Sequence, residues 1–247
     1  MRNYLFFLLF FIFFISCRQS SVNDSQIQNN FSFSPHKIWA HRVNTLEELE
    51  KKHQIFEGLE IDLIYSKYLN NLYVAHDESD TMRGILLEDW INYIPNPEKK
   101  WYWFDLKNLN KKNAENIANL LSEILKKYEI TDKTICENRN VKALAVLKRK
   151  GLAVAYWVNT DVFIWKIFGE KQWKKTIQKD ITFLKPNALC CSYTKYPILD
   201  TFFPNENILY WHTPVKFSPE NVEFTISLCQ MPHVKVVLVD YDEPICY

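Results

Sequence analysis

The chain has 247 residues, with 30 basic and 29 acidic side chains and a formal net charge of +1 at pH 7. This length suits a single α/β barrel, and the balanced charge argues against nucleic-acid binding, which usually requires a basic surface. Hydrophobic residues make up 47% of the chain and aromatic residues 15%, with only 4 glycines. The composition therefore predicts one large core, with disorder only near the ends.

The first 17 residues have the pattern of an export signal. Arg2 precedes an apolar run over residues 4–16, which is short for a membrane span. The sequence FISC at 14–17 resembles the lipobox of bacterial lipoproteins, in which the cysteine becomes the lipidated first residue. We therefore expect residues 1–17 to be a lipoprotein signal peptide and Cys17 to hold the protein in the bacterial cell envelope, outside the cytoplasm. An uncleaved signal anchor is the alternative, and it also tethers the chain to a membrane.

Residues 18–35 are polar, rich in Ser, Asn and Gln, and show neither a helical nor a strand period. They are predicted to form a flexible tether before a barrel domain over residues 36–247. The later cysteines lie in apolar runs without C-x-x-C spacing, so we interpret them as small core residues. These cysteines are Cys136, Cys190, Cys191, Cys229 and Cys246.

Beyond the tether, short β-like runs alternate with helix-like runs, which is typical of a parallel sheet. The predicted strands are, in chain order, KIWAH (37–41), GLEIDLIY (58–65), NLYVAH (71–76), WYWFDLK (101–107), KTICE (133–137), LAVAYWV (152–158), ALCCSY (188–193), ILYWHT (208–213) and VKVVLVDYD (234–242). The predicted helices are TLEELEKKH (45–53), LLEDWINYI (86–94), NAENIANLLSEILKKY (113–128), VKALAVLKRK (141–150), DVFIWKIFGEKQWKKTIQ (161–178) and SPENVEFTISLCQ (218–230).

The order of these elements predicts a (β/α)8 TIM-type barrel. The connection SKYLN, at 66–70, is too short for a crossover helix, so the second and third strands are expected to form a hairpin-like pair. Eight strands and one extra strand near the start then remain, which favours a barrel with its chemistry at the carboxyl ends of the strands. An open doubly wound sheet is the alternative, but the chain contains no G-x-G-x-x-G loop.

Strong polar side chains occur near the ends of the first four predicted strands. These are His41 and Arg42, Glu60 and Asp62, His76 and Asp77, and Asp105 and Lys107. Strand residues two apart point to the same face, so Glu60 and Asp62 project together. Because the carboxyl ends of barrel strands converge, we expect the whole set to meet at one mouth, where paired acids require a cation.

These motifs resemble a known series. The series consists of AHR followed by Asn44 and Thr45, then EID, VAHD and FDLK. Its order and spacing are similar to those of the motifs in the glycerophosphodiester phosphodiesterase and phospholipase-C-like superfamily, from about Lys37 to Asn108. FDLKN also resembles spider-venom phospholipase D, and HRVNTLEEL resembles the menorin family. Val43 stands where the first family commonly has glycine. The resemblance implies a barrel that cleaves phosphodiesters.

The resemblance also implies roles for the residues. His41 and His76 would be the general acid and base, and Arg42 and Lys107 would bind phosphate oxygens. The expected substrates are glycerophosphodiesters or lysophospholipid-type head groups. One divalent cation, Mg²⁺ or Ca²⁺, would bind to hard carboxylate ligands. The residues that match these ligands are Glu60, Asp62 and Asp105.

Alternatives remain open at the level of single residues. Glu60 could form a buried salt bridge with Arg42 or Lys107 instead of, or besides, binding a metal. Glu137, at the end of the fifth strand, could reach the site, bind Arg139 or cap the next helix. Trp157, Trp211 and His212 could contact a substrate alcohol at the rim, or the aromatic residues could belong to the core. The alternative function is a non-catalytic envelope barrel that binds a phosphorylated ligand or a glycan.

Overall fold

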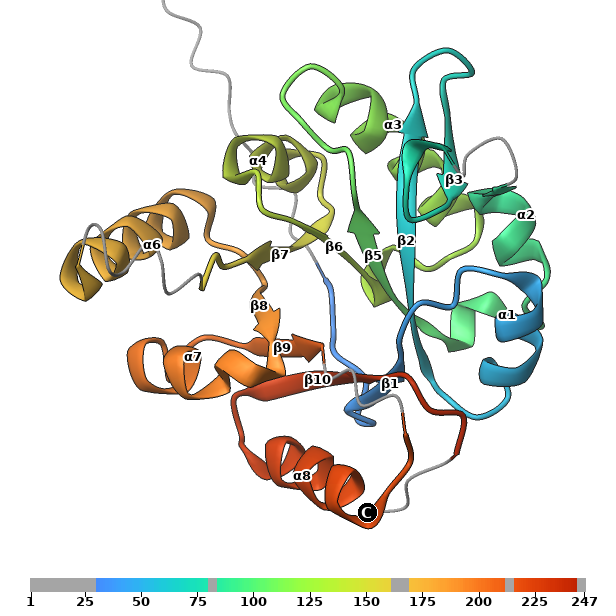
Figure 1. The fold of residues 1–247 in the computed structure, drawn as a ribbon. Helices are drawn as coiled ribbons and strands as arrows, with labels where there is room; N and C mark the ends of the chain where they lie inside the picture. Colours follow the sequence, from blue (N-terminus) through green and yellow to red (C-terminus); the bar gives the residue numbers. More distant parts are fainter. Residues whose placement is uncertain (1–29, 80–83, 161–168, 212–215, 244–247) are drawn as a thin grey trace, which may run out of the picture.

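The structure is a computed structural model that describes residues 30–79, 84–160, 169–211 and 216–243 (Figure 1). Within these ranges, eight parallel strands form a closed ring in the order β1-β10-β9-β8-β7-β6-β5-β2, because β2 also pairs with β1. The ring strands are β1 (Ile38–Ala40), β2 (Gly58–Ser66), β5 (Trp101–Leu106), β6 (Thr134–Asn138), β7 (Ala153–Trp157), β8 (Ala188–Ser192), β9 (Ile208–Trp211) and β10 (Val234–Val239). The predicted (β/α)8 barrel is confirmed.

Two strands extend the sheet outside the ring. β3 (Asn71–Val74) pairs antiparallel with the end of β2, with Leu63 opposite Val74, as the short connection predicted. β4 (Ile85–Leu86) adds to β3, so the extension has two described strands and not the single one expected. A pair of residues is too short to show a strand period, which explains why the sequence predicted a helix from 86.

Helices cover the outside of the ring (Figure 1). Their bounds are α1 (Leu46–Lys52), α2 (Leu87–Asn92), α3 (Ala114–Lys127), α4 (Val141–Arg149), α6 (Glu170–Leu184), α7 (Tyr196–Phe202) and α8 (Pro219–Gln230), and short 3₁₀ helices span Pro97–Lys99, Thr131–Lys133 and Tyr193–Lys195. α7 was not predicted, and residues 161–168 of the fifth predicted helix lie outside the described ranges. Within the described ranges, no helix combines the length and apolar character that a membrane span needs.

Strand alternation separates two buried clusters. One lies between the ring and its helices, and the other fills the interior of the ring. The interior cluster consists of Trp39, Trp103, Ile135, Ala153, Ala155, Ala188, Cys190, Leu209, Val236 and Leu238. On each ring strand, the inward position that follows the interior cluster towards the carboxyl end lies at the mouth of the barrel. The polar residues of the site occur at this level. The filled interior thus forms an apolar floor beneath the site.

The end of the expected tether contacts the barrel. Phe31 and Phe33 pack against the interior cluster, and Trp101 Nε1 donates to the Ser32 carbonyl at 2.9 Å. Residues 31–33 therefore pack at the end of the barrel opposite the mouth. Residues 1–29, including Cys17, lie outside the described ranges.

The described cysteines are small residues of the core. Cys136, Cys190, Cys191 and Cys229 are buried, as expected of core residues, and burial raises the pKa of the Cys136 thiol to about 12. Cys246 lies outside the described residues.

Candidate active site

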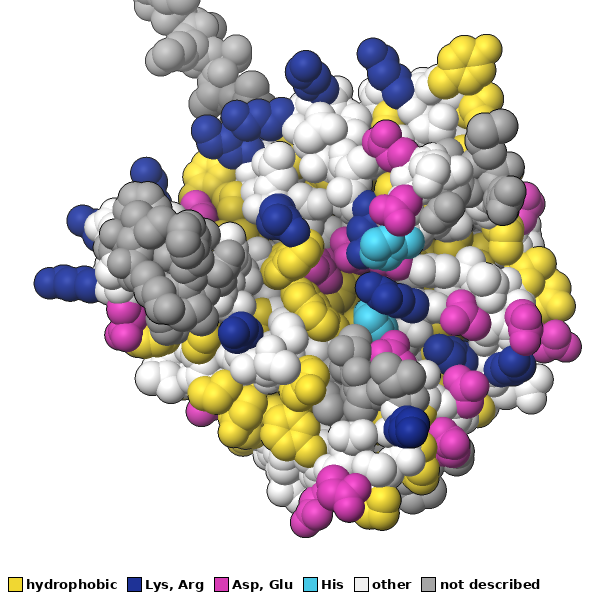
Figure 2. Space-filling view, viewed as in Figure 1, with side chains coloured by type: hydrophobic (Ala, Val, Ile, Leu, Met, Phe, Trp, Pro, Cys, Tyr) yellow, Lys and Arg dark blue, Asp and Glu magenta, His cyan; other side chains and the backbone are white. Residues whose placement is uncertain are grey.

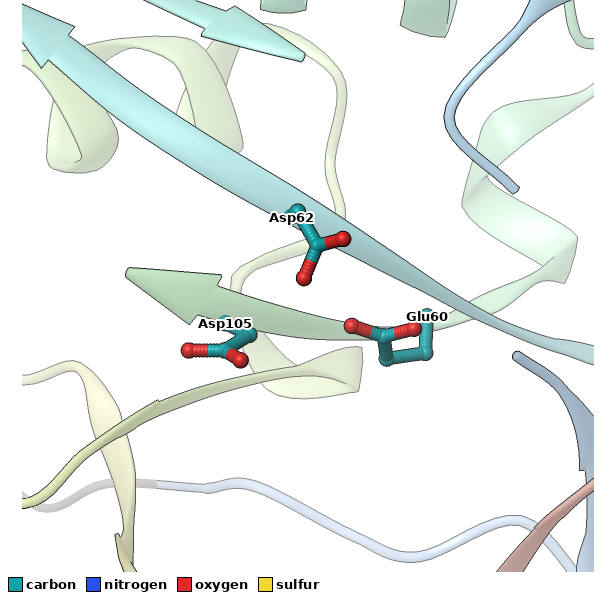
Figure 3. Close-up of side chains that lie close together, drawn as sticks. All are labelled: Glu60, Asp62 and Asp105. Carbon is teal, nitrogen blue, oxygen red and sulfur yellow. The ribbon is translucent and has the colours of Figure 1, made fainter. Parts of the chain in front are cut away.

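Three carboxylates converge at the mouth. Glu60 and Asp62 point inward from β2, and Asp105 points inward from the neighbouring β5, as Figure 3 shows. One oxygen of each lies within 4.8 Å of the other two. Glu60 and Asp62 are only 2% and 1% exposed, so these charges are removed from water. The structure thus brings together the three residues that the resemblance implied as metal ligands.

The cluster has an excess of negative charge. Lys107 Nζ lies 2.6 Å from Asp62 Oδ1 and 2.5 Å from Asp105 Oδ2, so one ammonium serves two carboxylates. Burial by itself lowers the pKa of Lys107, but Asp105 and Asp62 outweigh burial and raise it. Burial, followed by the charges of Asp62 and Asp105, raises the pKa of Glu60 well above its usual value. The third carboxylate therefore lacks a full cationic partner, which fits a hard divalent cation.

The salt bridges considered for Glu60 do not form. Lys107 pairs with the two aspartates, and Glu60 instead accepts a hydrogen bond from the Arg42 backbone N–H at 2.6 Å. Asn44 holds Asp62 from the other side: its Nδ2 donates to Asp62 Oδ2 at 2.6 Å, and its Oδ1 accepts from the Asp62 backbone N–H at 2.9 Å. These bonds orient the carboxylates without neutralising them.

His41 lies at the edge of the cluster. Its Nδ1 is 2.7 Å from Asp240 Oδ1 and its Nε2 is 3.7 Å from Glu60 Oε2. A carboxylate at this distance accepts the Nδ1 proton, which leaves Nε2 turned towards the site and able to exchange a proton. Asp240 follows β10 and was not assigned a role from the sequence. Its inward position, two residues after Leu238, was the available signal.

His76 lies on the open side of the mouth. Its side chain is 46% exposed, and its Nδ1 is 3.1 Å from Asp77 Oδ2. The preceding residue, Ala75, donates its backbone N–H to the Asp62 carbonyl at 3.0 Å, so His76 lies near the cluster. Figure 2 shows histidine, acidic and basic side chains gathered at the centre of this face. The structure thus brings both predicted histidines to the same mouth.

The turn after β1 accommodates Val43 without strain. The left-handed backbone falls on Arg42, at φ 50°, and not on Val43, so no glycine is required there. Val43 is fully buried, and its N–H donates to the Glu60 carbonyl at 2.9 Å. The Arg42 side chain is exposed and forms no ion pair with any described residue. Arg42 is therefore placed to bind an anion at the mouth.

Glu137 lies inside the barrel, beside Asp105 in the register of β5 and β6. It is 3% exposed and accepts from Trp103 Nε1 at 2.6 Å. Burial, together with the charge of Asp105, raises its pKa well above the usual value. The pairing with Arg139 and the helix-capping role are not seen, since the Asn140 side chain caps α4. Glu137 therefore supports the floor of the site.

No protein-family model matches the chain, and no curated protein is significantly similar to it in sequence. Solved structures do match. A glycerophosphodiester phosphodiesterase from Parabacteroides distasonis is 16% identical with a TM-score of 0.59, over 83% of this chain and 92% of that one. A phosphodiesterase from Oleispira antarctica, in complex with the product sn-glycerol-3-phosphate, is 17% identical with a TM-score of 0.60, over 84% and 94%. The chain shares its fold with these phosphodiesterases.

The same fold also occurs in a protein of another class. A glycerol uptake operon antiterminator regulatory protein from Listeria monocytogenes is 11% identical with a TM-score of 0.55, over 85% of this chain and 95% of that one. Function therefore has to be argued from the residues at the mouth.

Proposed function

We propose that the protein is a metal-dependent phosphodiesterase, a hydrolase or lyase that acts on glycerophosphodiesters or lysophospholipid-type head groups. The observation that carries the proposal is the buried carboxylate cluster of Glu60, Asp62 and Asp105, within 4.8 Å, beside two histidines at a barrel mouth. The solved phosphodiesterase with bound sn-glycerol-3-phosphate supports a small phosphodiester as the substrate.

The three carboxylates would hold one divalent cation, Mg²⁺ or Ca²⁺. When bound, such a cation neutralises charge on a phosphate oxygen. Lys107 keeps Asp62 and Asp105 in place, and its charge is largely matched by theirs. Arg42, which has no described ion-pair partner, is the cation better placed to bind a phosphate oxygen.

Two proton transfers are needed, one from the attacking hydroxyl and one to the departing alcohol. His41 would accept a proton at Nε2, because Asp240 holds its Nδ1 at 2.7 Å. His76 is the more exposed of the pair and would donate to the leaving alcohol at the open side. The attacking hydroxyl is either water, which makes the protein a hydrolase, or a hydroxyl of the substrate, which makes it a lyase that forms a cyclic phosphate.

The test is a panel of phosphodiesters assayed with Mg²⁺, with Ca²⁺ and with EDTA. We expect turnover only with a divalent cation, and a loss on the order of 100-fold or more in His41→Ala and in His76→Ala. His36→Ala is the matched control, since His36 lies near Glu57 with 65% of its side chain exposed. Full activity in either of the first two variants would contradict the assigned mechanism.

Metal binding has a separate readout. Titration calorimetry with Mg²⁺ or Ca²⁺ is expected to show one site that is lost in Asp62→Asn and weakened in Glu60→Gln. Unchanged affinity in both variants would rule out the proposed ligand set.

A specific observation also favours the non-catalytic alternative. Lys107 already bridges two of the three carboxylates, so the cluster is partly neutralised from within the chain. In that case the barrel would bind a phosphorylated ligand or a glycan in the envelope without turnover. Tight binding that persists in Asp62→Asn, with no hydrolysis of any phosphodiester, would favour this function.

We further propose that Cys17 carries a lipid that anchors the barrel in the bacterial cell envelope. The support is the apolar run at 4–16 and the FISC sequence before a polar segment. Metabolic labelling with a fatty acid, followed by membrane fractionation, tests this localisation. Wild-type protein should be labelled and sediment with membranes, and Cys17→Ser should not be labelled.

A further inference from the structure

Arg139 lies at the mouth, at a position that the proposed mechanism does not use. It follows directly on the end of β6, two residues after Glu137, and it is exposed. In the ring, β6 is next to β5, which carries Asp105, and β5 is next to β2. Arg42, after β1, and Arg139, after β6, therefore flank the carboxylate cluster from opposite sides.

The side chain of Arg139 is held by aromatic rings. Its guanidinium carbon lies 3.9 Å from the centre of the Trp157 ring, and Trp211 contacts Trp157 edge-on with ring centres 5.3 Å apart. Both tryptophans pack onto the interior cluster of the barrel. Stacking leaves the N–H groups along the edge of a guanidinium available to an anion, while it restricts the movement of the side chain.

The backbone around Arg139 is fixed as well. Asn138 Nδ2 donates to the Leu106 carbonyl at 2.6 Å, and Asn138 Oδ1 accepts from the Asn140 backbone N–H at 2.7 Å. Arg139 forms no ion pair with any carboxylate in the described ranges. A positioned cation without an anionic partner, beside a site for phosphodiesters, indicates a place for a second negative group.

We propose that Arg139, stacked on Trp157, forms an anion-binding subsite for a second negatively charged group on the substrate's alcohol, such as a terminal phosphate. This inference rests on the proposed phosphodiesterase function and narrows its substrate class. The scissile phosphate lies at the carboxylate cluster, and the alcohol extends over β6 and β7 towards Arg139. A cationic head group such as choline is disfavoured there, because it would face the guanidinium.

Two substrates with the same scissile bond test the subsite. Glycerophosphoglycerol ends in an uncharged hydroxyl, and its terminal phosphate monoester carries the second anion. We expect kcat/KM of the wild-type protein to be about tenfold higher for the phosphate monoester, mostly through KM, since the contact is remote from the reacting atoms. Arg139→Gln should abolish this preference and leave turnover of glycerophosphoglycerol within about twofold. Arg139→Lys should retain part of the preference.

The control is Arg149→Gln on α4, an exposed arginine 3.7 Å from Glu115, which should keep the full preference. Turnover of both substrates without a preference, or an equal loss on both in Arg139→Gln, would overturn the subsite while leaving the phosphodiesterase in place. If neither substrate is turned over with any metal, the proposed function fails. The subsite is then tested by calorimetric binding of the phosphate monoester. Binding should weaken in Arg139→Gln and not in Arg149→Gln, and any other result would contradict the subsite.

Discussion

The carboxylates at the mouth keep their arrangement because each has a bonded neighbour and little contact with water. Asp62 is bound by Asn44 and Lys107, and Glu60 by the Arg42 backbone N–H. A buried carboxylate without a full counter-charge is costly, and the raised pKa of Glu60 expresses that cost. This cost is one reason why the cluster supports the proposed cation site.

Asp240 is predicted to act through His41. Asp240→Asn removes the acceptor that lies 2.7 Å from His41 Nδ1, so the ring loses its orientation and its preferred protonated nitrogen. We expect kcat to fall on the order of 100-fold with KM nearly unchanged, measured on the best phosphodiester of the panel. Asp132→Asn, at an exposed aspartate on the opposite end of the barrel, should have no effect. An equal fall in both variants would contradict the role.

Glu137 is predicted to make stability depend on pH. Burial raises its pKa in the folded protein above the usual unfolded value of about 4.3, so folding favours the protonated form. The stability that protonated Glu137 contributes is fully present below its pKa in the unfolded chain. It is lost as the pH rises through its pKa in the folded protein. The thermal midpoint of the metal-free wild-type protein should therefore fall relative to Glu137→Gln between pH 5 and pH 9. Parallel curves for the two proteins would contradict the prediction.

At the scale of elements, β2 is the strand that organises the site. It pairs with β1, β5 and β3, and it carries Glu60 and Asp62 at consecutive inward positions. Its first residue, Gly58, is also on the inward face, where it contacts the Trp39 ring. The strand thus joins the packed floor of the barrel to the carboxylates above it.

Gly58→Ala is predicted to destabilise the barrel. An added Cβ would lie 2.0 Å from the Trp39 ring, so the indole has to shift within a filled interior. We expect the free energy of unfolding to fall by about 1–3 kcal/mol in urea denaturation. In a Trp39→Leu background the same substitution should cost less, because the clash is removed. Equal costs in both backgrounds would show that the ring contact is not the cause.

At the scale of the whole molecule, the barrel is closed at one end by aromatic packing, and the carboxylates lie at the other end. Phe31 and Phe33 contact each other edge-on, with centres 4.9 Å apart, and cover the interior cluster from below. A membrane tether attached there would leave the mouth at the opposite end.

Replacing both Phe31 and Phe33 with alanine is predicted to lower the free energy of unfolding by about 1–3 kcal/mol, since the two rings are only partly buried. Phe183→Ala is the matched control: Phe183 is 61% exposed on α6, and its loss should change stability by less than about 0.5 kcal/mol. Urea denaturation of the three proteins provides the measurement. A double variant as stable as the wild type would show that the floor closes without these rings.

The sequence by itself determined the local pattern of the barrel. Alternating β-like and helix-like runs predicted the ring strands, and the short connection at 66–70 predicted the β2–β3 pair. Because Glu60 and Asp62 are two residues apart in a predicted strand, the sequence was enough to place them on the same inward face. The resemblance to phosphodiesterases then placed Asp105 with them. These features depend on residues that are close in sequence, so the periodicity of the sequence predicts them.

Only the tertiary structure decided which side chains meet across the mouth. His41 and Asp240 lie 199 residues apart in sequence, and their contact exists because the ring brings β1 beside β10. The bridge from Lys107 to Asp62, and the stacking of Arg139 on Trp157, likewise depend on how neighbouring strand ends are placed. Contacts between strand ends a few ångströms apart follow from closure of the barrel, and no local pattern encodes that closure residue by residue.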